Sequence, residues 1–321
     1  MIVPAYNVER YIDDCMLSLR VQEHDDLEIV VVSDGSRDGS MERVRAHAAI
    51  DHRIKIIEQE HRGLGGARNT GIARASGEFV MFVDSDDFVS ALCLKTLLET
   101  QRRGNYDIVS GRHIKVSDSS EFLGYENAWS VPNVTPPLSD YEKVLGLYAH
   151  SVVCARLFKR HILLNAGIKF PEELPHEDLF FTYKILRLYP NHCHLPNRIY
   201  FWRQREQSLS KSITKNHLTA WLHLRRDTCA FLDSVSASER EYTLSARRNI
   251  HFLNHLMKIA KTSESALIDA FMEAIRSSRS EILEDFRHVD QAGSDISYYA
   301  PGLREMVAAA AKWSDGSAGA A

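Results

Sequence analysis

The sequence has few cysteines and no long apolar run. Its five cysteines are odd in number and widely scattered, and no two have CxxC spacing, which argues against a disulfide framework and for a reducing compartment. No apolar run approaches the roughly 20 residues that cross a bilayer, and the N-terminus lacks the basic and apolar regions of a signal peptide. We therefore expect a cytoplasmic protein.

The sequence also lacks an excess of charge of either sign. It contains 39 Lys and Arg residues against 43 Asp and Glu residues, a formal net charge of −4. Such a chain has no overall field that would favour nucleic acid or an anionic membrane, so we expect no nucleic-acid partner. Its 321 residues, 44% of them hydrophobic, are enough for one large domain and a smaller one.

Short strands and helices alternate along the first half of the chain. Alternation of this kind is typical of a parallel sheet with right-handed crossover helices, so we predict an α/β fold. The predicted strands cover residues 2–3, 27–33, 54–58 and 79–83, and the predicted helices between them cover residues 8–21, 39–50 and 67–75.

The second half of the chain has a helical pattern. Beyond residue 215 apolar residues recur near a 3.6-residue period, and Ser238 with Glu241 has the spacing of a capping box at a helix start. The Ser-, Gly- and Ala-rich end indicates a linker or a disordered tail. We predict a sheet domain over residues 1–212, a helical accessory domain over residues 213–313 and a flexible tail over residues 314–321.

The most informative stretch is the apolar strand at residues 79–83 and the acids that follow it. These are Asp84, Asp86 and Asp87, with Ser85 among them. Carboxylates there lie where open α/β sheets bind ligands, and Mg²⁺ or Mn²⁺ is commonly shared between carboxylates and substrate phosphates. A cap for the next helix would account for Asp87, but such a cap needs only one acid. Three neighbouring carboxylates repel one another unless a cation is present. We therefore predict a metal and sugar-phosphate site.

Polar residues also follow the first two predicted strands. Pro4-Ala5-Tyr6-Asn7 follows the first, and Tyr6 offers an aromatic face on which a base could stack. The second ends in Ser33-Asp34-Gly35-Ser36, where the Asp34 carboxylate could accept a hydrogen bond from a uracil imide. On its own an Asp-Gly turn explains this second stretch better. The presence of Tyr6 shifts the balance toward a nucleotide pocket.

Residues 62–69 form a glycine-rich stretch that leads into a helix. Backbone N–H groups of this stretch, together with Arg68, could face a diphosphate. It contains no Gly-Lys-Ser or Gly-Lys-Thr, and no GxGxxG follows the first strand. Kinase-like and dehydrogenase functions therefore lose their main support.

The ordered set Pro-Ala-Tyr-Asn, Ser-Asp-Gly-Ser, Gly-Ala-Arg-Asn and Asp-Ser-Asp-Asp resembles the inverting family 2 glycosyltransferases with the GT-A fold. That fold is Rossmann-like, with a mostly parallel central sheet and flanking helices, and the resemblance covers residues 2 to about 212. It implies a DXD motif in which Asp86 binds Mn²⁺ or Mg²⁺ with support from Asp84. The nucleotide-sugar contacts that it implies are Pro4, Ala5, Tyr6, Asp34, Arg68, Asp84 and Ser85.

Two later motifs match the same family. His176-Glu177-Asp178 resembles its Glu-Asp element, which implies Asp178 as the general base and Glu177 beside it. The alternative is that both acids only occupy the first turn of a helix, where negative charge interacts favourably with the helix dipole. Arg205 matches the Arg-rich loop that closes over the donor phosphates, and the alternative is an exposed surface charge.

A narrower resemblance concerns residues 157–160, 170–174 and 177–178, which are similar to glycosyltransferases that decorate wall teichoic acid or build capsules. Together with the family resemblance it implies a UDP-sugar donor and a polysaccharide or polyol-phosphate acceptor, while a place at the inner face of the cell membrane stays open. Peripheral membrane association and a homo-oligomer stay open. So do two other functions: a non-catalytic GT-A module that binds or scaffolds, and a nucleotidyltransferase, in which the Glu-Asp pair would lack a purpose.

Overall fold

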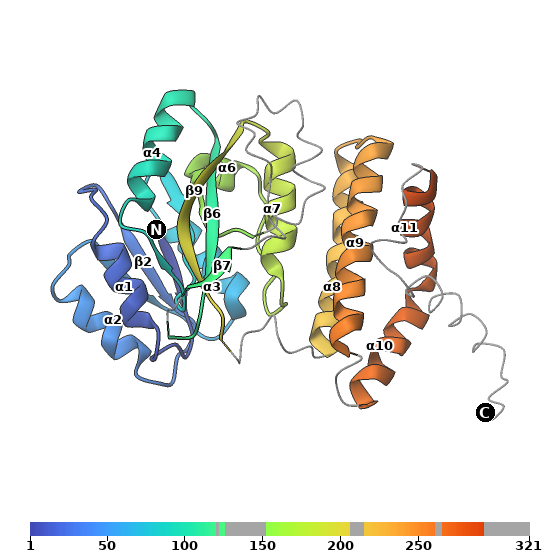
Figure 1. Ribbon diagram of the computed structural model, residues 1–321, viewed down its shortest axis with the longest axis horizontal. Coiled ribbons are helices and arrows are strands. Elements are labelled where there is room, and N and C mark those ends of the chain that lie inside the picture. The colour runs from blue at the N-terminus through green and yellow to red at the C-terminus, as the bar shows by residue number, and fades with distance from the viewer. Residues whose placement is uncertain (120–121, 126–151, 206–214, 261–264, 292–321) are drawn as a thin grey trace. The chain divides into compact units, whose positions relative to one another are not determined.

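The computed structural model describes residues 1–119, 122–125, 152–205, 215–260 and 265–291 (Figure 1). These residues divide into two compact units. The first, up to residue 205, combines strands and helices, and the second, from residue 215, is helical. The predicted domain boundary at residue 212 and the predicted tail at residues 314–321 lie outside the described residues.

Three parallel strands open the first unit in the spatial order β1-β2-β3. Every residue of β1 and β2 is buried, which explains their continuous apolar sequences. The strands are β1 (Ile2–Ala5), β2 (Ile29–Ser33) and β3 (Ile54–Glu58), and the helices that follow each of them are α1 (Ile12–Arg20), α2 (Ser40–Ala48) and α3 (Gly63–Arg74).

Helix α1 begins four residues later than the predicted helix at residues 8–21, because tertiary contacts hold the residues before it. The Val8 N–H donates to Ser40 Oγ at 2.8 Å, and the Glu9 N–H donates to Asp38 Oδ2 at 3.0 Å. Asn7 has a positive φ of 51°. These contacts with the start of α2 hold the residues after β1 in a turn, so the helix starts only beyond them.

A second set of strands has the order β4-β8-β6-β9-β5, with β7 paired to β6. β6 and β9 are parallel, whereas the other pairs are antiparallel. The strands are β4 (Phe79–Met81), β5 (Phe88–Val89), β6 (Ile108–Val116), β7 (Phe122–Tyr125), β8 (Arg156–Lys159) and β9 (His192–Arg203). Figure 1 shows the long strands β6 and β9 side by side.

The end of β4 joins the two sets of strands. Ile2 and Phe82 form a parallel bridge, and the Val83 N–H donates to Ile2 O at 3.0 Å. The carboxyl ends of β1, β2 and β4 therefore meet at one edge of the sheet, and the polar residues that follow them share it. The helices α4 (Cys93–Gly104), α6 (Arg160–Asn165) and α7 (Glu177–Leu188) complete the described part of this unit.

The second unit contains four described helices, α8 (Lys215–Ser234), α9 (Glu239–Ala260), α10 (Ser265–Ser277) and α11 (Arg279–Gln291) (Figure 1). The buried Arg225 of α8 is 2.9 Å from Asp285 and 3.1 Å from Glu284, both on α11. The predicted capping box is confirmed, because the Ser238 N–H donates to Glu241 Oε2 at 2.8 Å just before α9. Among the described residues, no helix is long and apolar enough to span a membrane.

Candidate active site

The buried carboxylate of Asp34 lies at the end of β2 and is held by groups that follow β3. Oδ1 accepts hydrogen bonds from Gln59 Nε2 at 2.7 Å and from the Arg62 N–H at 2.8 Å. His61 Nδ1 lies 2.9 Å from Oδ2. Because a carboxylate has about four lone-pair sites, Asp34 keeps acceptor capacity for a further ligand.

Tyr6 joins this pocket through His61. The two ring centroids are 4.4 Å apart and the rings are tilted by 31°, while the Tyr6 side chain is 45% exposed. His61 therefore contacts both predicted nucleotide residues, Tyr6 and Asp34. Sequence reasoning missed His61 and Gln59, although both follow the third parallel strand and so had to reach the same edge.

The three acids after β4 have three different sets of partners. Asp84 Oδ1 is 2.7 Å from Arg68 Nη2, and Asp86 Oδ2 is 2.5 Å from Arg205 Nη2. Burial raises the pKa of Asp86, while the charge of Arg205 lowers it and that of Asp84 raises it. Arg205 is thus paired with the predicted metal ligand, and it also lies 5.2 Å from the centre of the Tyr11 ring.

Asp87 anchors strand β9 to the acidic turn. Its Oδ2 accepts a hydrogen bond from the Tyr200 hydroxyl at 2.8 Å, and its Oδ1 accepts one from the Arg203 N–H at 2.8 Å. The Tyr200 oxygen in turn accepts the Asp84 N–H at 3.0 Å. The interpretation of Asp87 as a helix cap is wrong, because α4 begins only at Cys93 and has no side-chain cap. Burial raises the pKa of Asp87 well above its usual range.

Arg68 connects the acidic turn with the start of α7. Its side chain is only 2% exposed, and its guanidinium forms ion pairs with both Asp84 and Glu177. Its guanidinium also lies 5.5 Å from the centre of the Phe170 ring. The predicted residues Asp84, Arg68 and Glu177 are therefore in direct contact.

The Glu177-Asp178 pair opens α7 directly after His176, which has a left-handed φ of 62°. Burial raises the pKa of Glu177 to about 7, against the charge of Arg68, which lowers it. Burial also raises the pKa of Asp178, while Arg68 lowers it and Asp84 raises it. The backbone at Val153 and Leu179 also lowers the pKa of Asp178. A raised pKa makes a carboxylate a better proton acceptor, so Asp178 has the environment of a general base.

The remaining predicted contacts lie on the same edge. Pro4 and Ala5 form the buried end of β1, and Ser85 is buried in the acidic turn between Asp84 and Asp86. Sequence reasoning missed Tyr200, and of the two arginines in residues 202–206 it preferred Arg205 to Arg203. Arg203 is the last residue of β9, and its Nε donates to Asp86 O at 2.9 Å. Its side chain is buried, so the alternative of an exposed surface charge is wrong for Arg203. No pattern in the sequence distinguishes Tyr200 from any other buried strand residue.

The two carboxylates of Asp84 and Asp86 fit a divalent cation that binds together with substrate. No cluster of three or more ligating side chains occurs within the described residues. The side chains of Asp84 and Asp86 are 31% and 20% exposed, so both stay within reach of a ligand. Mg²⁺ and Mn²⁺ accept one or two carboxylates and take their other oxygens from substrate phosphates and water. These residues would hold such an ion, but they do not form a complete site without the donor.

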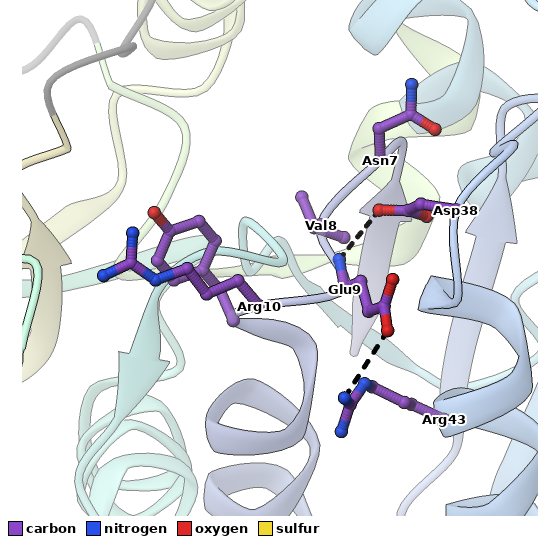
Figure 2. A pocket seen from close by; sticks show the side chains of 7 residues that line it. Asn7, Val8, Glu9, Arg10, Asp38 and Arg43 are labelled. Atoms are coloured by element: carbon purple, nitrogen blue, oxygen red, sulfur yellow. Dashed lines mark hydrogen bonds and ion pairs between the residues drawn. The ribbon is translucent and has the colours of Figure 1, made fainter.

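A separate hollow opens beside the turn between β1 and α1 (Figure 2). Its charged groups have protein partners: the Glu9 N–H donates to Asp38 Oδ2 at 3.0 Å, and Arg43 lies 3.5 Å from the Glu9 carboxylate (Figure 2). Arg10 lies 2.7 Å from Asp118. None of the predicted site residues lines it. The lining residues are Asn7, Val8, Glu9, Arg10, Tyr11, Asp38 and Arg43.

The family model described as glycosyl transferase family 2 matches residues 1–163. Glycosyltransferase GlyA of Streptococcus pneumoniae is 31% identical over 275 residues, which cover 83% of this chain but only 37% of GlyA. The poly(ribitol-phosphate) beta-N-acetylglucosaminyltransferase TarS of Staphylococcus aureus is 30% identical over 195 residues, which cover 57% of this chain and 31% of TarS.

Solved structures share the fold. The crystal structure of TarS 1–349 from S. aureus in complex with UDP-GlcNAc has a TM-score of 0.69 at 22% identity, covering 88% of this chain and 80% of that chain. The mannosyltransferase PcManGT from Pyrobaculum calidifontis, in complex with GDP-Man and Mn²⁺, has a TM-score of 0.53 at 18% identity, covering 98% and 86%. The predicted α/β fold is thus confirmed: the chain belongs to glycosyl transferase family 2 and has the GT-A fold.

Proposed function

We propose that the protein is an inverting, metal-dependent glycosyltransferase that moves a sugar from a UDP-sugar to a hydroxyl group of a surface polysaccharide or teichoic-acid-like polymer. The observation that carries the proposal is the contact of Arg68 with both Asp84 and Glu177. It joins the DXD turn to the residue that precedes Asp178. The candidate base therefore directly follows a residue that shares an ion-pair partner with a candidate donor-binding carboxylate.

The nucleotide would bind at the end of β1 and β2. Asp34 offers a fixed carboxylate for a uracil N–H, and Tyr6 offers a half-exposed ring. The TarS complexes with UDP-GlcNAc and with UDP support a uridine nucleotide as donor. The name of TarS, a poly(ribitol-phosphate) beta-N-acetylglucosaminyltransferase, supports a polyol-phosphate polymer as acceptor. Pro4, Ala5 and Ser85 would line the same edge.

In the proposed reaction the Asp178 carboxylate accepts the proton of the acceptor hydroxyl. The hydroxyl oxygen then bonds to the anomeric carbon from the face opposite the nucleotide, the bond to the diphosphate oxygen breaks, and UDP leaves with that electron pair. Asp84 and Asp86 would hold Mn²⁺ or Mg²⁺, which when bound neutralises charge on the departing diphosphate. Arg205, paired with Asp86 at 2.5 Å, would add positive charge on the same side.

We also propose that residues 1–212 form the donor-binding domain and that the helices up to residue 313 form an accessory domain. The second described unit has a buried ion pair of its own between Arg225 and Asp285, which supports an independent core. A non-catalytic GT-A module is the alternative function. The raised pKa of Asp178 and the exposure of Asp84 and Asp86 favour the enzyme.

The proposed function predicts that the chain releases UDP from at least one UDP-sugar in the presence of Mn²⁺. A panel of UDP-sugars is assayed with water and with short polyol-phosphates as acceptors, and the thermal midpoint is measured with UDP, because a ligand that binds only the native state raises it. EDTA should reduce release to background, and undiminished turnover in EDTA would contradict the metal role. Binding of UDP without release from any donor would favour the non-catalytic module.

A further inference from the structure

The first two turns of α3 pack directly against the segment that leads to the candidate base. Asn69 uses both ends of its side-chain amide on Phe170: Nδ2 donates to Phe170 O at 2.9 Å, and Oδ1 accepts the Phe170 N–H at 2.9 Å. This pair of bonds joins residues 101 positions apart in the sequence. Asn69 therefore fixes both the position and the orientation of the backbone at Phe170.

The glycines in the first turn of α3 allow the same close contact. A Cβ at Gly65 would overlap Pro171 O, and a Cβ at Gly63 would lie 3.0 Å from the Glu173 N. Beside them Arg62 forms a two-point ion pair with Glu172, at 3.0 and 2.5 Å. The predicted glycine-rich loop is therefore the covered first turn of α3, and its small residues allow the backbone of residues 171–173 to approach.

Phe170 connects this contact to both sides of the candidate active site. Its ring stacks on Phe181 of α7, with centroids 3.8 Å apart, and meets Phe82 edge-on at 5.4 Å. Phe82 lies two residues before Asp84, and Phe181 lies three residues after Asp178. A shift of Phe170 would therefore move the strand end and the start of α7 relative to each other.

Arg68 holds the other end of the same segment. Its two terminal nitrogens contact Asp84 and Glu177, and the side chain is buried. A contact between these nitrogens and a diphosphate would require them to leave both carboxylates. The observed contacts favour a role for Arg68 in holding α7 beside the acidic turn.

We propose that residues 62–69 position the base-carrying segment 170–178, with Asn69 and Arg68 as the positioning residues. The inference rests on the proposed function, because it gives a purpose to the spacing between Asp84 and Asp178. Holding reacting groups in place contributes strongly to enzyme rates, and a misplacement of about 1 Å can cost about 100-fold in turnover.

The test replaces Asn69, which touches neither a candidate ligand-binding group nor the base. Asn69→Ala is compared with Asn191→Ala, a matched control whose exposed side chain donates one bond to the Asn105 O at 3.0 Å. Three quantities are measured with Mn²⁺ present: UDP affinity, turnover of the best UDP-sugar, and hydrogen exchange of the amides around Phe170. Asn69→Asp, which keeps the acceptor for the Phe170 N–H but loses the donor, replaces Asn69→Ala if that variant does not fold.

We expect Asn69→Ala to keep its UDP affinity while turnover falls about 10- to 100-fold and the Phe170 amide exchanges faster. Asn191→Ala should match the native chain in UDP affinity, turnover and hydrogen exchange at Phe170. Native turnover in Asn69→Ala overturns the positioning role, and so does a parallel fall of UDP affinity and turnover in both variants. If the native chain releases no UDP, the proposed function is overturned instead. In that case the positioning role is still tested, because an unchanged hydrogen-exchange rate of the Phe170 amide in Asn69→Ala would overturn it.

Discussion

The acids at the sheet edge differ in their partners and in their exposure, although burial shifts the pKa of each in the same direction. Asp86 and Asp178 keep partial access to solvent, whereas Asp87 is enclosed by Tyr200 and the Arg203 N–H. Since burial penalises the charged form, each of these acids has a raised pKa. The difference lies in the partners: Asp87 accepts hydrogen bonds from two neutral donors, while Asp86 forms an ion pair with Arg205.

His113 of β6 makes the stability of the first unit sensitive to acid. Burial lowers its pKa to about 3, with smaller lowering effects from Arg156 and His194 and an opposing effect from Asp84. A histidine whose folded pKa is depressed contributes stability above its unfolded pKa of about 6.5, and that stability is lost as the pH falls toward the folded value. The native chain should therefore weaken as the pH drops below about 6.5.

We expect His113→Phe to remove this loss. Between about pH 7 and about pH 5 the free energy of unfolding should fall by about 2 kcal/mol less in His113→Phe than in the native chain. Urea unfolding at the two pH values measures this difference in the free energy of unfolding. His52→Phe, which changes an exposed histidine, should behave like the native chain. Equal losses in native and His113→Phe chains would rule out the contribution of His113.

At the scale of elements, α9 depends on a local start signal that the sequence predicts. The Ser238 hydroxyl accepts the Glu241 N–H at 3.4 Å, and the Ser238 N–H donates to the Glu241 carboxylate. Ser238→Ala should lower the free energy of unfolding by about 1 kcal/mol, because it removes an N-cap acceptor. Ser234→Ala, at the exposed end of α8, should change it by less than about 0.5 kcal/mol. Urea unfolding compares the two, and equal effects would contradict the capping role.

The strands β1, β2 and β4 were predictable because continuous apolar sequences are typical of buried strands. The starts of α1 and α3 were not. Side chains of α2 and its preceding turn hold the residues before α1, and Pro171 covers the first turn of α3. Both contacts come from residues 29 or more positions away, so the helix propensities of the local sequence could not predict them.

At the scale of the molecule, the edge position of Asp34 and Asp84 followed from the order of strands and acids along the chain. The pairing of β8 and β9 with the earlier strands did not, and neither did the roles of Tyr200 and Arg203, which stand more than 110 positions after Asp87. The sequence thus predicts that Asp34 and Asp84 reach the edge. It does not predict which residues pair there, because pairing depends on strands whose neighbours are distant in the sequence.

The most direct test of the proposed function compares the native chain with Asp178→Asn, using the UDP-sugar that the native chain turns over fastest with Mn²⁺. Asparagine keeps the shape of aspartate and one acceptor oxygen, but it cannot accept the proton. We predict that turnover falls by about 100-fold or more while UDP affinity stays unchanged. Asp26→Asn, at an exposed position, should retain native turnover. An Asp178→Asn chain with native turnover would contradict the assignment of Asp178 as the general base.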